Sequence, residues 1–272
     1  MKKALALACI AACGAAAWFC QRGAGRTGGP AEAELVIAGL GGFRGILSEI
    51  VWFRADRLQN EGRYSEMAQL ANILVTLEPR TPEVWAYAAW NLSYNISVMM
   101  PTDEDRWRWV EAGLKLLRDD GLRLNPESPE LHRELAWLFL SKIGGSVDAA
   151  SRLYARKWGA EVECAEGDWS RLKMIPSLVS YIDANYGAQN WKDPKASAIY
   201  WAHRGLSLRP AGAVRAELRQ VVYQALMLET VEDRRFAPAA MRAMRDAYIE
   251  MPRPSLKDLM DRFEAKFPEA SR

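Results

Sequence analysis

Apolar residues recur at helical spacing along most of the chain. Within 62–77 they fall at positions 67, 70, 71, 74 and 77, which share one face of a helix. Pro79 predicts the end of this helix, because proline cannot continue the hydrogen-bond ladder and disfavours helical backbone in the residue before it. Thr81 and Pro82 predict the start of the next helix, as the N-cap and the first helical position. The pattern therefore predicts a helical hairpin.

The same pattern is repeated further along the chain. The stretch 82–96 reads PEVWAYAAWNLSYNI, and 129–143 reads PELHRELAWLFLSKI, so the second follows the first at an offset of 47 residues. A common helical-hairpin repeat has about 34 residues, so this copy is longer than usual. Ser128 before Pro129 repeats the helix-start signal of Thr81 before Pro82. The sequence thus predicts an array of helical hairpins.

Other segments also show helical patterns, and none has the period of two that marks a strand. A helix is expected from 35 to 59, starting after Gly41-Gly42, and Thr102 with the acids after it predicts another N-terminus. Segment 159–190 reads as short helices and loops around a core of Trp169, Leu172, Ile175 and Tyr181. Further helices are expected at 82–98, 102–124, 147–158, 193–209, 214–230, 238–250 and after a cap at Ser255. The expected fold class is all-α, with stacked antiparallel hairpins forming a short solenoid and extra C-terminal helices.

The N-terminus differs from the rest of the chain. Two lysines precede an uncharged apolar run over 4–20, the outline of an export signal. Three interpretations stay open: an uncleaved signal-anchor, a lipoprotein acylated at Cys13, and a signal cleaved, for example, after Ala17. Each places the rest of the chain outside the cytoplasm, on the periplasmic side. The expected organisation is an anchor or signal at 1–20, a flexible tether at 21–34, a repeat region at 35–158, and a helical region at 159–272 packed on the repeats.

Composition narrows the function classes. The chain has 272 residues, 50% hydrophobic residues and eleven tryptophans, which is ample for a folded core. A formal net charge of +2 with the two signs interspersed gives no electrostatic footprint for nucleic acid. Cys164 is the only cysteine after residue 20, so no internal disulfide is expected there. We expect its thiol to be inert and buried.

The turn before Tyr64, the Leu-x-Pro helix ends and the Trp or Ala-Ala helix starts resemble tetratricopeptide repeats, over 48–158 and more loosely over 190–230. Met67 and Ala71 depart from that pattern, which usually has alanine and a large aromatic there. The stretches FRGILSEIVWFRADRLQNEGRY and NYGAQNWKDPKASAIYWA are similar to a group of bacterial membrane-anchored helical-repeat proteins with no assigned activity. The resemblance implies a fold and a tether.

Stacked hairpins present the first helix of each pair on a concave face, where many such proteins bind a partner. The candidate partner-binding residues on that face are Glu49, Trp52, Asp56, Glu83, Trp90, Tyr94, Glu130, Arg133 and Trp137. The competing interpretation is that Trp90 and Trp137 pack in the core, as large aromatics at helical spacing usually do. Asn91 and Asn95 with Tyr94 are expected to form a buried hydrogen-bond network that joins helices.

Candidate chemistry is sparse. The chain has two histidines, and it lacks zinc-protease, nucleophile-elbow and phosphate-loop motifs. The acids at 103–105 are explained by the helix dipole rather than by a metal. We therefore expect no enzyme activity, catalytic residue, metal or cofactor. The expected function is a membrane-tethered scaffold for protein–protein interaction in the cell envelope. The alternatives are a periplasmic carrier with a small ligand between the repeats and the C-terminal helices, and an unrecognised hydrolase.

Overall fold

The structure is a computed structural model that describes residues 43–146 and 148–271. The predicted anchor, Cys13 and the tether at 21–34 lie outside the described residues. The chain divides into a compact unit that ends at Trp52 and a second unit from Phe53 to Arg272. Each unit is considered by itself. The described residues are helices joined by turns, with no strand among them, so the all-α prediction is confirmed.

The helices and their bounds follow in chain order. The α-helices are α3 (Phe43–Asn60), α4 (Tyr64–Leu77), α5 (Pro82–Trp90), α6 (Asp103–Lys115), α7 (Leu122–Leu124), α8 (Pro129–Trp137), α9 (Ser151–Cys164), α10 (Pro176–Tyr186), α11 (Pro194–Ser207), α12 (Gly212–Glu232), α13 (Ala237–Glu250) and α14 (Pro254–Lys266). The π-helical segments are η1 (Asn91–Ile96), η2 (Leu116–Gly121) and η3 (Leu138–Ile143). Short 3₁₀ turns are η4 (Trp169–Leu172), η5 (Arg234–Phe236) and η6 (Pro268–Ser271).

The first predicted hairpin boundary is confirmed. Gly62 has a φ of 69°, a conformation that glycine adopts without steric cost, and it turns the chain between α3 and α4. On α4, Met67 and Leu74 are fully buried, as their spacing predicts. Met67 packs with Ala55 and Leu58 at the end of α3 in a small apolar cluster. The pattern of apolar residues therefore identified the buried face of α4 correctly.

The predicted helix starts are confirmed, but not every predicted cap forms. Pro82 and Pro129 each stand in the first turn of a helix. The Ser128 hydroxyl accepts a hydrogen bond from the Leu131 N–H at 3.3 Å, whereas the Thr81 side chain makes no capping bond. Thr81 has the extended backbone of an N-cap, so the prediction failed only for its hydroxyl.

Two further predicted caps give opposite results. The Thr102 hydroxyl accepts from the Asp105 N–H, as expected of a cap at the start of α6. Ser255, by contrast, lies inside α14, because that helix begins one residue earlier at Pro254. The prediction of a Ser255 cap was wrong. A proline pre-set for the first helical turn places the N-cap at Arg253, two residues before the predicted one.

The repeated segments share a feature that periodicity did not predict. The helix expected over 82–98 is continuous but is wound as a π-helix in η1, and the matching stretch after α8 is wound in the same way in η3. A π-helical turn carries i→i+5 hydrogen bonds, as between the Ser97 N–H and the Leu92 carbonyl. The wider turn changes the direction in which the following side chains leave the helix.

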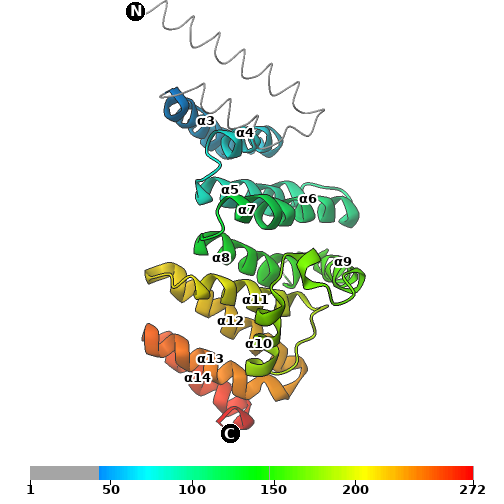
Figure 1. Cartoon of the computed structure of the whole chain (residues 1–272), viewed down its shortest axis with the longest axis vertical. Coiled ribbons are helices and arrows are strands. Elements are labelled where there is room, and N and C mark those ends of the chain that lie inside the picture. The colour runs from blue at the N-terminus through cyan, green and yellow to red at the C-terminus, as the bar shows by residue number, and fades with distance from the viewer. Residues whose placement is uncertain (1–42, 147, 272) are drawn as a thin grey trace, which may run out of the picture. The chain divides into compact units, whose positions relative to one another are not determined.

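The main core of the second unit is built on α11. This helix packs against both α8 and α12, and α12 packs in turn against α13 (Figure 1). Trp158, Tyr154 and Phe139 are fully buried there, and the predicted inward positions Ala150 and Tyr154 are confirmed. Both predicted regions, before and after position 158, contribute to this one core, and α9 runs through that position.

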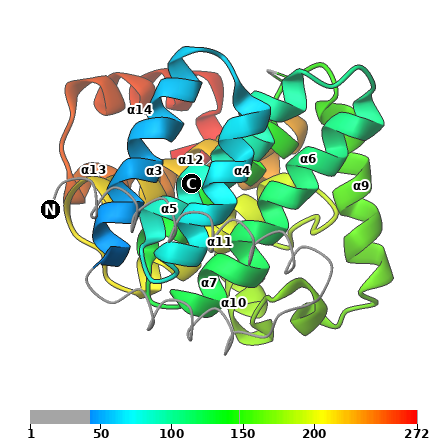
Figure 2. The ribbon, with the colours of Figure 1, turned by 90° about the horizontal axis from the view of Figure 1, so that it is seen from above.

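Close helix crossings depend on small residues. A Cβ built on Gly113 of α6 would lie 2.0 Å from the Ser93 hydroxyl oxygen, so only glycine fits where α6 meets η1. Helix α6 also contacts α9, and the two lie along the same edge when the molecule is viewed from above (Figure 2). These contacts connect the first repeated segment to the helix that follows the second.

Segment 159–190 differs in detail from its prediction. α9 continues through Gly159 to Cys164, and α10 follows after the η4 turn. Leu172 is buried as expected, but Ile175 and Tyr181 are exposed. Cys164 is also exposed, so the expectation of a buried thiol was wrong. These residues lie on the outer surface because the large side chains of α9 and α11 already fill the core.

None of the described helices combines the length and the apolar character that a bilayer crossing requires.

Candidate protein-binding face

Two tryptophans occupy equivalent positions in the repeated segments and are exposed. Trp90 ends α5 and Trp137 ends α8, at the 47-residue offset. Their side chains are 40% and 42% exposed, whereas Trp85 and Trp158 are buried. The expectation that Trp90 and Trp137 pack in the core was therefore wrong. Each is followed directly by a π-helical segment, and the core positions of α5 and α8 are held by other residues.

Tyr94 links Trp90 to the second repeated segment. Its ring stacks on Trp90 with the centroids 5.9 Å apart and the planes 22° apart. Its hydroxyl lies 2.7 Å from the Ser141 hydroxyl of the next repeat. Ser141 donates its own hydrogen to the Trp137 carbonyl at 2.8 Å, so Tyr94 must be the donor to Ser141. We call Trp90, Tyr94 and Trp137 the aromatic ridge.

The Tyr94 hydroxyl stays protonated at neutral pH. Burial raises the pKa of Tyr94 to about 12, the hydrogen bond with Ser141 opposes this shift, and the nearby Glu134 carboxylate adds to it. A protonated phenol keeps the direction of its hydrogen bond to Ser141 fixed. Tyr94 therefore makes a hydrogen bond of fixed direction between the two repeated segments.

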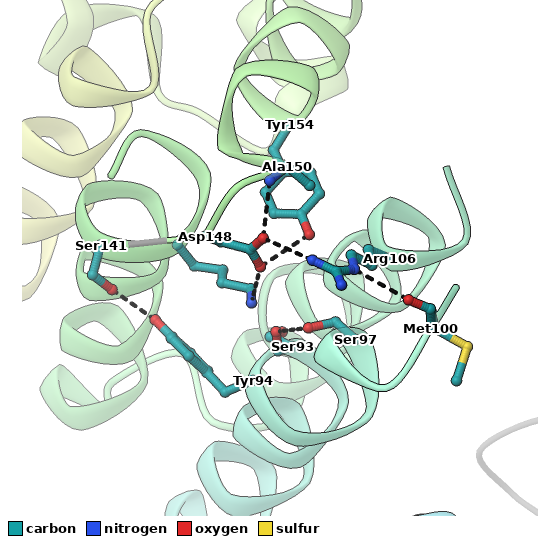
Figure 3. A network of polar contacts seen from close by, with 10 residues as sticks. Ser93, Tyr94, Ser97, Met100, Arg106, Ser141, Asp148, Ala150 and Tyr154 are labelled. Carbon is teal, nitrogen blue, oxygen red and sulfur yellow. Dashed lines mark hydrogen bonds and ion pairs between the residues drawn. The ribbon is translucent and has the colours of Figure 1, made fainter. Parts of the chain in front are cut away.

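A buried charge cluster lies beside Tyr94 (Figure 3). The Lys142 ammonium donates to Asp148 Oδ2 at 2.5 Å, and Arg106 Nη1 lies 3.4 Å from Asp148 Oδ1. The Tyr154 hydroxyl also donates to Asp148 Oδ2, at 3.1 Å. The same ammonium lies 5.4 Å from the centroid of the Tyr94 ring, within the range of a cation–π contact. The cluster joins α6, η3 and α9.

Asp148 is the shared acceptor of that cluster. Burial tends to raise the pKa of its carboxyl, but hydrogen bonds from Lys142 and from the Ala150 N–H outweigh burial and hold the pKa below its ordinary value. The side chains of Asp148 and Lys142 are 6% and 5% exposed. The cluster is therefore a charged, nearly dry junction between the two repeats.

Of the charged candidate residues near the ridge, one is exposed and the others are already engaged with neighbouring side chains. Glu83 is exposed and lies seven residues before Trp90, on the same side of the helix. Glu130 stands in the same relation to Trp137, but its carboxylate accepts from the Ser128 hydroxyl at 2.9 Å. Arg133 forms ion pairs with Glu134 and with Glu217 of α12, the latter at 2.8 Å. Arg133 is thus engaged in holding α8 to α12.

The first three candidate residues lie elsewhere in the chain. Glu49 is exposed and Trp52 is half-buried, and both belong to the unit that ends at Trp52. Asp56, in the second unit, is exposed and accepts a weak hydrogen bond from Asn60 Nδ2 at 3.4 Å. The structure therefore stacks Tyr94 on Trp90 and connects Tyr94, through Ser141, to the Trp137 carbonyl. Glu49 and Trp52 belong to the first unit, which is considered by itself.

The predicted asparagine network is confirmed in part. Asn91 is fully buried, and its side-chain oxygen accepts from Asn95 Nδ2 at 3.1 Å within the same helix. The bond that joins helices is made instead by Tyr94 and Ser141. Ser141 was missed because a serine inside an apolar run gives no signal of its own. Its equivalence to Tyr94 at the 47-residue offset was the signal available.

Groups with potential chemistry are few in the described part of the chain. His132 and His203 are largely buried, and burial lowers the pKa of each to about 4. No cluster of three or more His, Cys, Asp or Glu side chains suited to a metal ion occurs among residues 43–146 and 148–271.

Comparison of the chain with protein-family models, with curated proteins and with solved structures gave no match.

Proposed function

We propose that this chain is a non-enzymatic, membrane-tethered scaffold that binds another protein through the aromatic ridge. The proposal includes a fold of antiparallel helical hairpins stacked in the manner of tetratricopeptide repeats. It also includes an N-terminal anchor that places the helices on the outer side of the cytoplasmic membrane. Protein binding is the part that the structure of the second unit supports most directly.

The repeat arrangement is supported by the matching segments. α5 with η1 and α8 with η3 have the same lengths and the same change from α- to π-helix, at an offset of 47 residues. Tyr94 and Ser141, which hydrogen-bond to each other, occupy the same position in the two segments. One surface feature is therefore presented twice on adjacent helices, as expected of a repeat protein with a binding face.

The exposure of both ridge tryptophans is the observation that carries the proposal. A tryptophan side chain has roughly 250 Å² of surface, so 40% exposure leaves on the order of 100 Å² of each in water. Covering that area would contribute about 2.5 kcal/mol per tryptophan at about 25 cal/mol per Å². Two such residues held rigidly, with Tyr94 between them, have the character of binding hot spots.

The charges beside the ridge indicate the chemistry of the partner. Glu83 is exposed, and the carboxylate of Glu134 is near enough to Tyr94 to raise its pKa. A partner segment that offers apolar side chains to the tryptophans and a lysine or arginine to these acids fits this face. The acids favour the rate and specificity of association more than its strength.

Site-specific photo-crosslinking in cells tests the proposal. A photoreactive amino acid placed at Trp90 of the full-length protein should give a discrete, higher-mass adduct with a partner. The matched control is Ile249, an apolar residue of α13 that is 76% exposed and lies off the ridge. Equal adducts from both positions, or none from Trp90, would contradict binding at the ridge.

The anchor requires a separate test. Cys13→Ala in the full-length chain distinguishes the two modes of membrane attachment. A lipoprotein should lose its acyl mass and leave the membrane fraction, whereas a signal-anchor should be unaffected. Release of the unsubstituted protein into the soluble fraction would contradict both.

A further inference from the structure

A second feature of the molecule lies away from the ridge. A cavity of about 310 Å³ opens between the repeated segments and the C-terminal helices. Its walls come from η2 and α7, from α8, from the turn that precedes α10, and from α11. This volume is at the lower end of small-ligand pockets, so it suits a small molecule rather than a protein segment.

The cavity is lined by more positively charged side chains than negatively charged ones. Four cationic side chains line it, Arg118, Arg123, Lys173 and Arg204, against the single carboxylate of Asp119. Arg118 pairs with Asp119 at 2.8 Å, and Arg123 pairs with Asp120 at 3.4 Å. Within the described part of the chain, neither Lys173 nor Arg204 forms an ion pair. Two positive charges at the cavity are therefore uncompensated.

Two buried donors in the lining lack an acceptor. Arg118 and Trp201 are 8% and 3% exposed. Arg118 Nη1 and Trp201 Nε1 have no hydrogen-bond partner among residues 43–146 and 148–271, although Arg118 Nη1 lies 3.7 Å from a Glu161 carboxylate oxygen. Buried donors are almost always satisfied in folded proteins, because leaving one unpaired is destabilising. Both atoms are shielded from solvent, so a ligand in the cavity reaches them only if the Arg118 and Trp201 side chains shift.

Two other side chains define the polarity of the cavity. The Tyr200 hydroxyl accepts from the Ile175 N–H at 2.7 Å and so keeps its own hydrogen available for donation. His132 Nδ1 lies 2.7 Å from the Ser128 carbonyl, which fixes the ring hydrogen there. Burial and the nearby Arg204 keep His132 neutral by lowering its pKa to about 4. The cavity thus presents mainly donors and positive charge.

We infer that this cavity binds a small dianionic oxyanion, inorganic phosphate or the phosphate group of a small phosphate monoester. The two negative charges match the two uncompensated cations, Lys173 and Arg204. The phosphate oxygens accept from the Lys173 ammonium and the Arg204 guanidinium. Arginine is well suited to this role, because its planar guanidinium binds phosphate through paired hydrogen bonds. A singly charged carboxylate leaves one of these two cations uncompensated.

Calorimetric titration of the full-length protein with inorganic phosphate, at ionic strength balanced with sodium chloride, tests the inference. Saturable binding of one phosphate per chain is expected, with acetate binding at least about tenfold more weakly because it carries half the charge. A small phosphate monoester such as glycerol phosphate should compete with phosphate. Failure to compete would restrict the site to the free ion, and acetate binding equal to phosphate would overturn the assignment.

Variants locate the binding in the cavity. Arg204→Gln should weaken phosphate binding about tenfold or more, since it removes a charged donor. Trp201→Phe keeps the ring and removes only a shielded N–H, so it should bind phosphate like the unsubstituted protein. Lys173→Gln, at an exposed position, serves if Arg204→Gln fails to fold. The matched control is Arg152→Gln, on the exposed side of α9 and outside the cavity. Equal binding by all variants, or equal loss in the control, would overturn the proposal.

The inference does not depend on partner binding at the ridge. Trp90→Ala should bind phosphate like the unsubstituted protein, because Trp90 does not line the cavity. Loss of phosphate binding in that variant would also contradict the assignment.

Discussion

The buried charge cluster around Asp148 provides a test of stability. The expected loss of stability follows from how deeply its side chains are buried. Asp148→Asn keeps the shape of the side chain but removes its charge. The Lys142 ammonium, 5% exposed, would then be left without its anionic partner, and Arg106 would lose its carboxylate as well. Breaking a buried ion pair from one side typically costs 3–5 kcal/mol. We expect about 3 kcal/mol here, because Arg106 is 26% exposed and can turn toward water.

An exposed ion pair supplies the control. Lys115 and Glu111 form an i,i+4 pair on α6 at 2.6 Å, with side chains 52% and 27% exposed. Glu111→Gln should therefore cost only about 0.3–0.5 kcal/mol. Urea unfolding of both full-length variants, followed by far-ultraviolet circular dichroism, measures the difference. A loss for Asp148→Asn no larger than that for Glu111→Gln would refute the view that the cluster joins the repeats.

The same cluster predicts how the stability of the fold changes with pH. The pKa of Asp148 is lower in the folded chain than its ordinary value of 3.8. An acid of this kind stabilises the fold fully above its unfolded pKa, and the stabilisation is lost as the pH falls through the folded value. The difference between the unsubstituted protein and Asp148→Asn should thus be constant near neutral pH and shrink below about pH 4. A difference that instead grows on acidification would show that the sign is wrong.

Three further predictions concern stability. Ser128→Ala should cost about 1 kcal/mol through its lost capping bond, whereas Thr81→Ala should cost much less; equal losses in urea unfolding would contradict the difference in capping. Burial, with Asp193 nearby, raises the pKa of Glu229 to about 8, so stability should fall as the pH rises from about 4.5 to 8. Glu229→Gln should remove that fall, worth up to about 4 kcal/mol at pH 8, and an unchanged pH profile would contradict it. Gly113→Ala should cost on the order of 2–3 kcal/mol, because its Cβ meets the Ser93 hydroxyl; an unchanged melting temperature would contradict that packing.

Much of the helical architecture could be predicted because its signals are local. Pro82, Pro129 and Pro194 each stand in the first turn of a helix, and the spacing of apolar residues on α4 identified its buried face. The π-helical segments could not be predicted in this way. They depend on how α5 and α8 pack against neighbouring helices, and no short sequence pattern specifies them.

The candidate site could be predicted less well from the sequence. The 47-residue offset identified Trp90 and Trp137 as equivalent, but their burial depended on helices that the pattern does not place in space. Position 85 carries a buried tryptophan, and the equivalent His132 is buried too, so these positions rather than the ridge face the core. The cavity could not be predicted either, because Lys173 and Arg204 come together only through tertiary folding.

The central claim, that the ridge binds a partner rather than supporting the fold, is tested most directly by measuring stability and partner recovery in the same variants. Trp90→Ala and Trp137→Ala in the full-length protein should each cost about 2 kcal/mol, less than a core truncation, because part of each side chain is already in water. Trp158→Ala, at a fully buried position, should cost about 3–5 kcal/mol. Affinity capture from solubilised membranes should recover the partner with the unsubstituted protein and with Ile249→Ala. Each ridge variant should weaken capture by about 2 kcal/mol or more. Ridge variants that lose as much stability as Trp158→Ala, or that recover the partner undiminished, would contradict the claim.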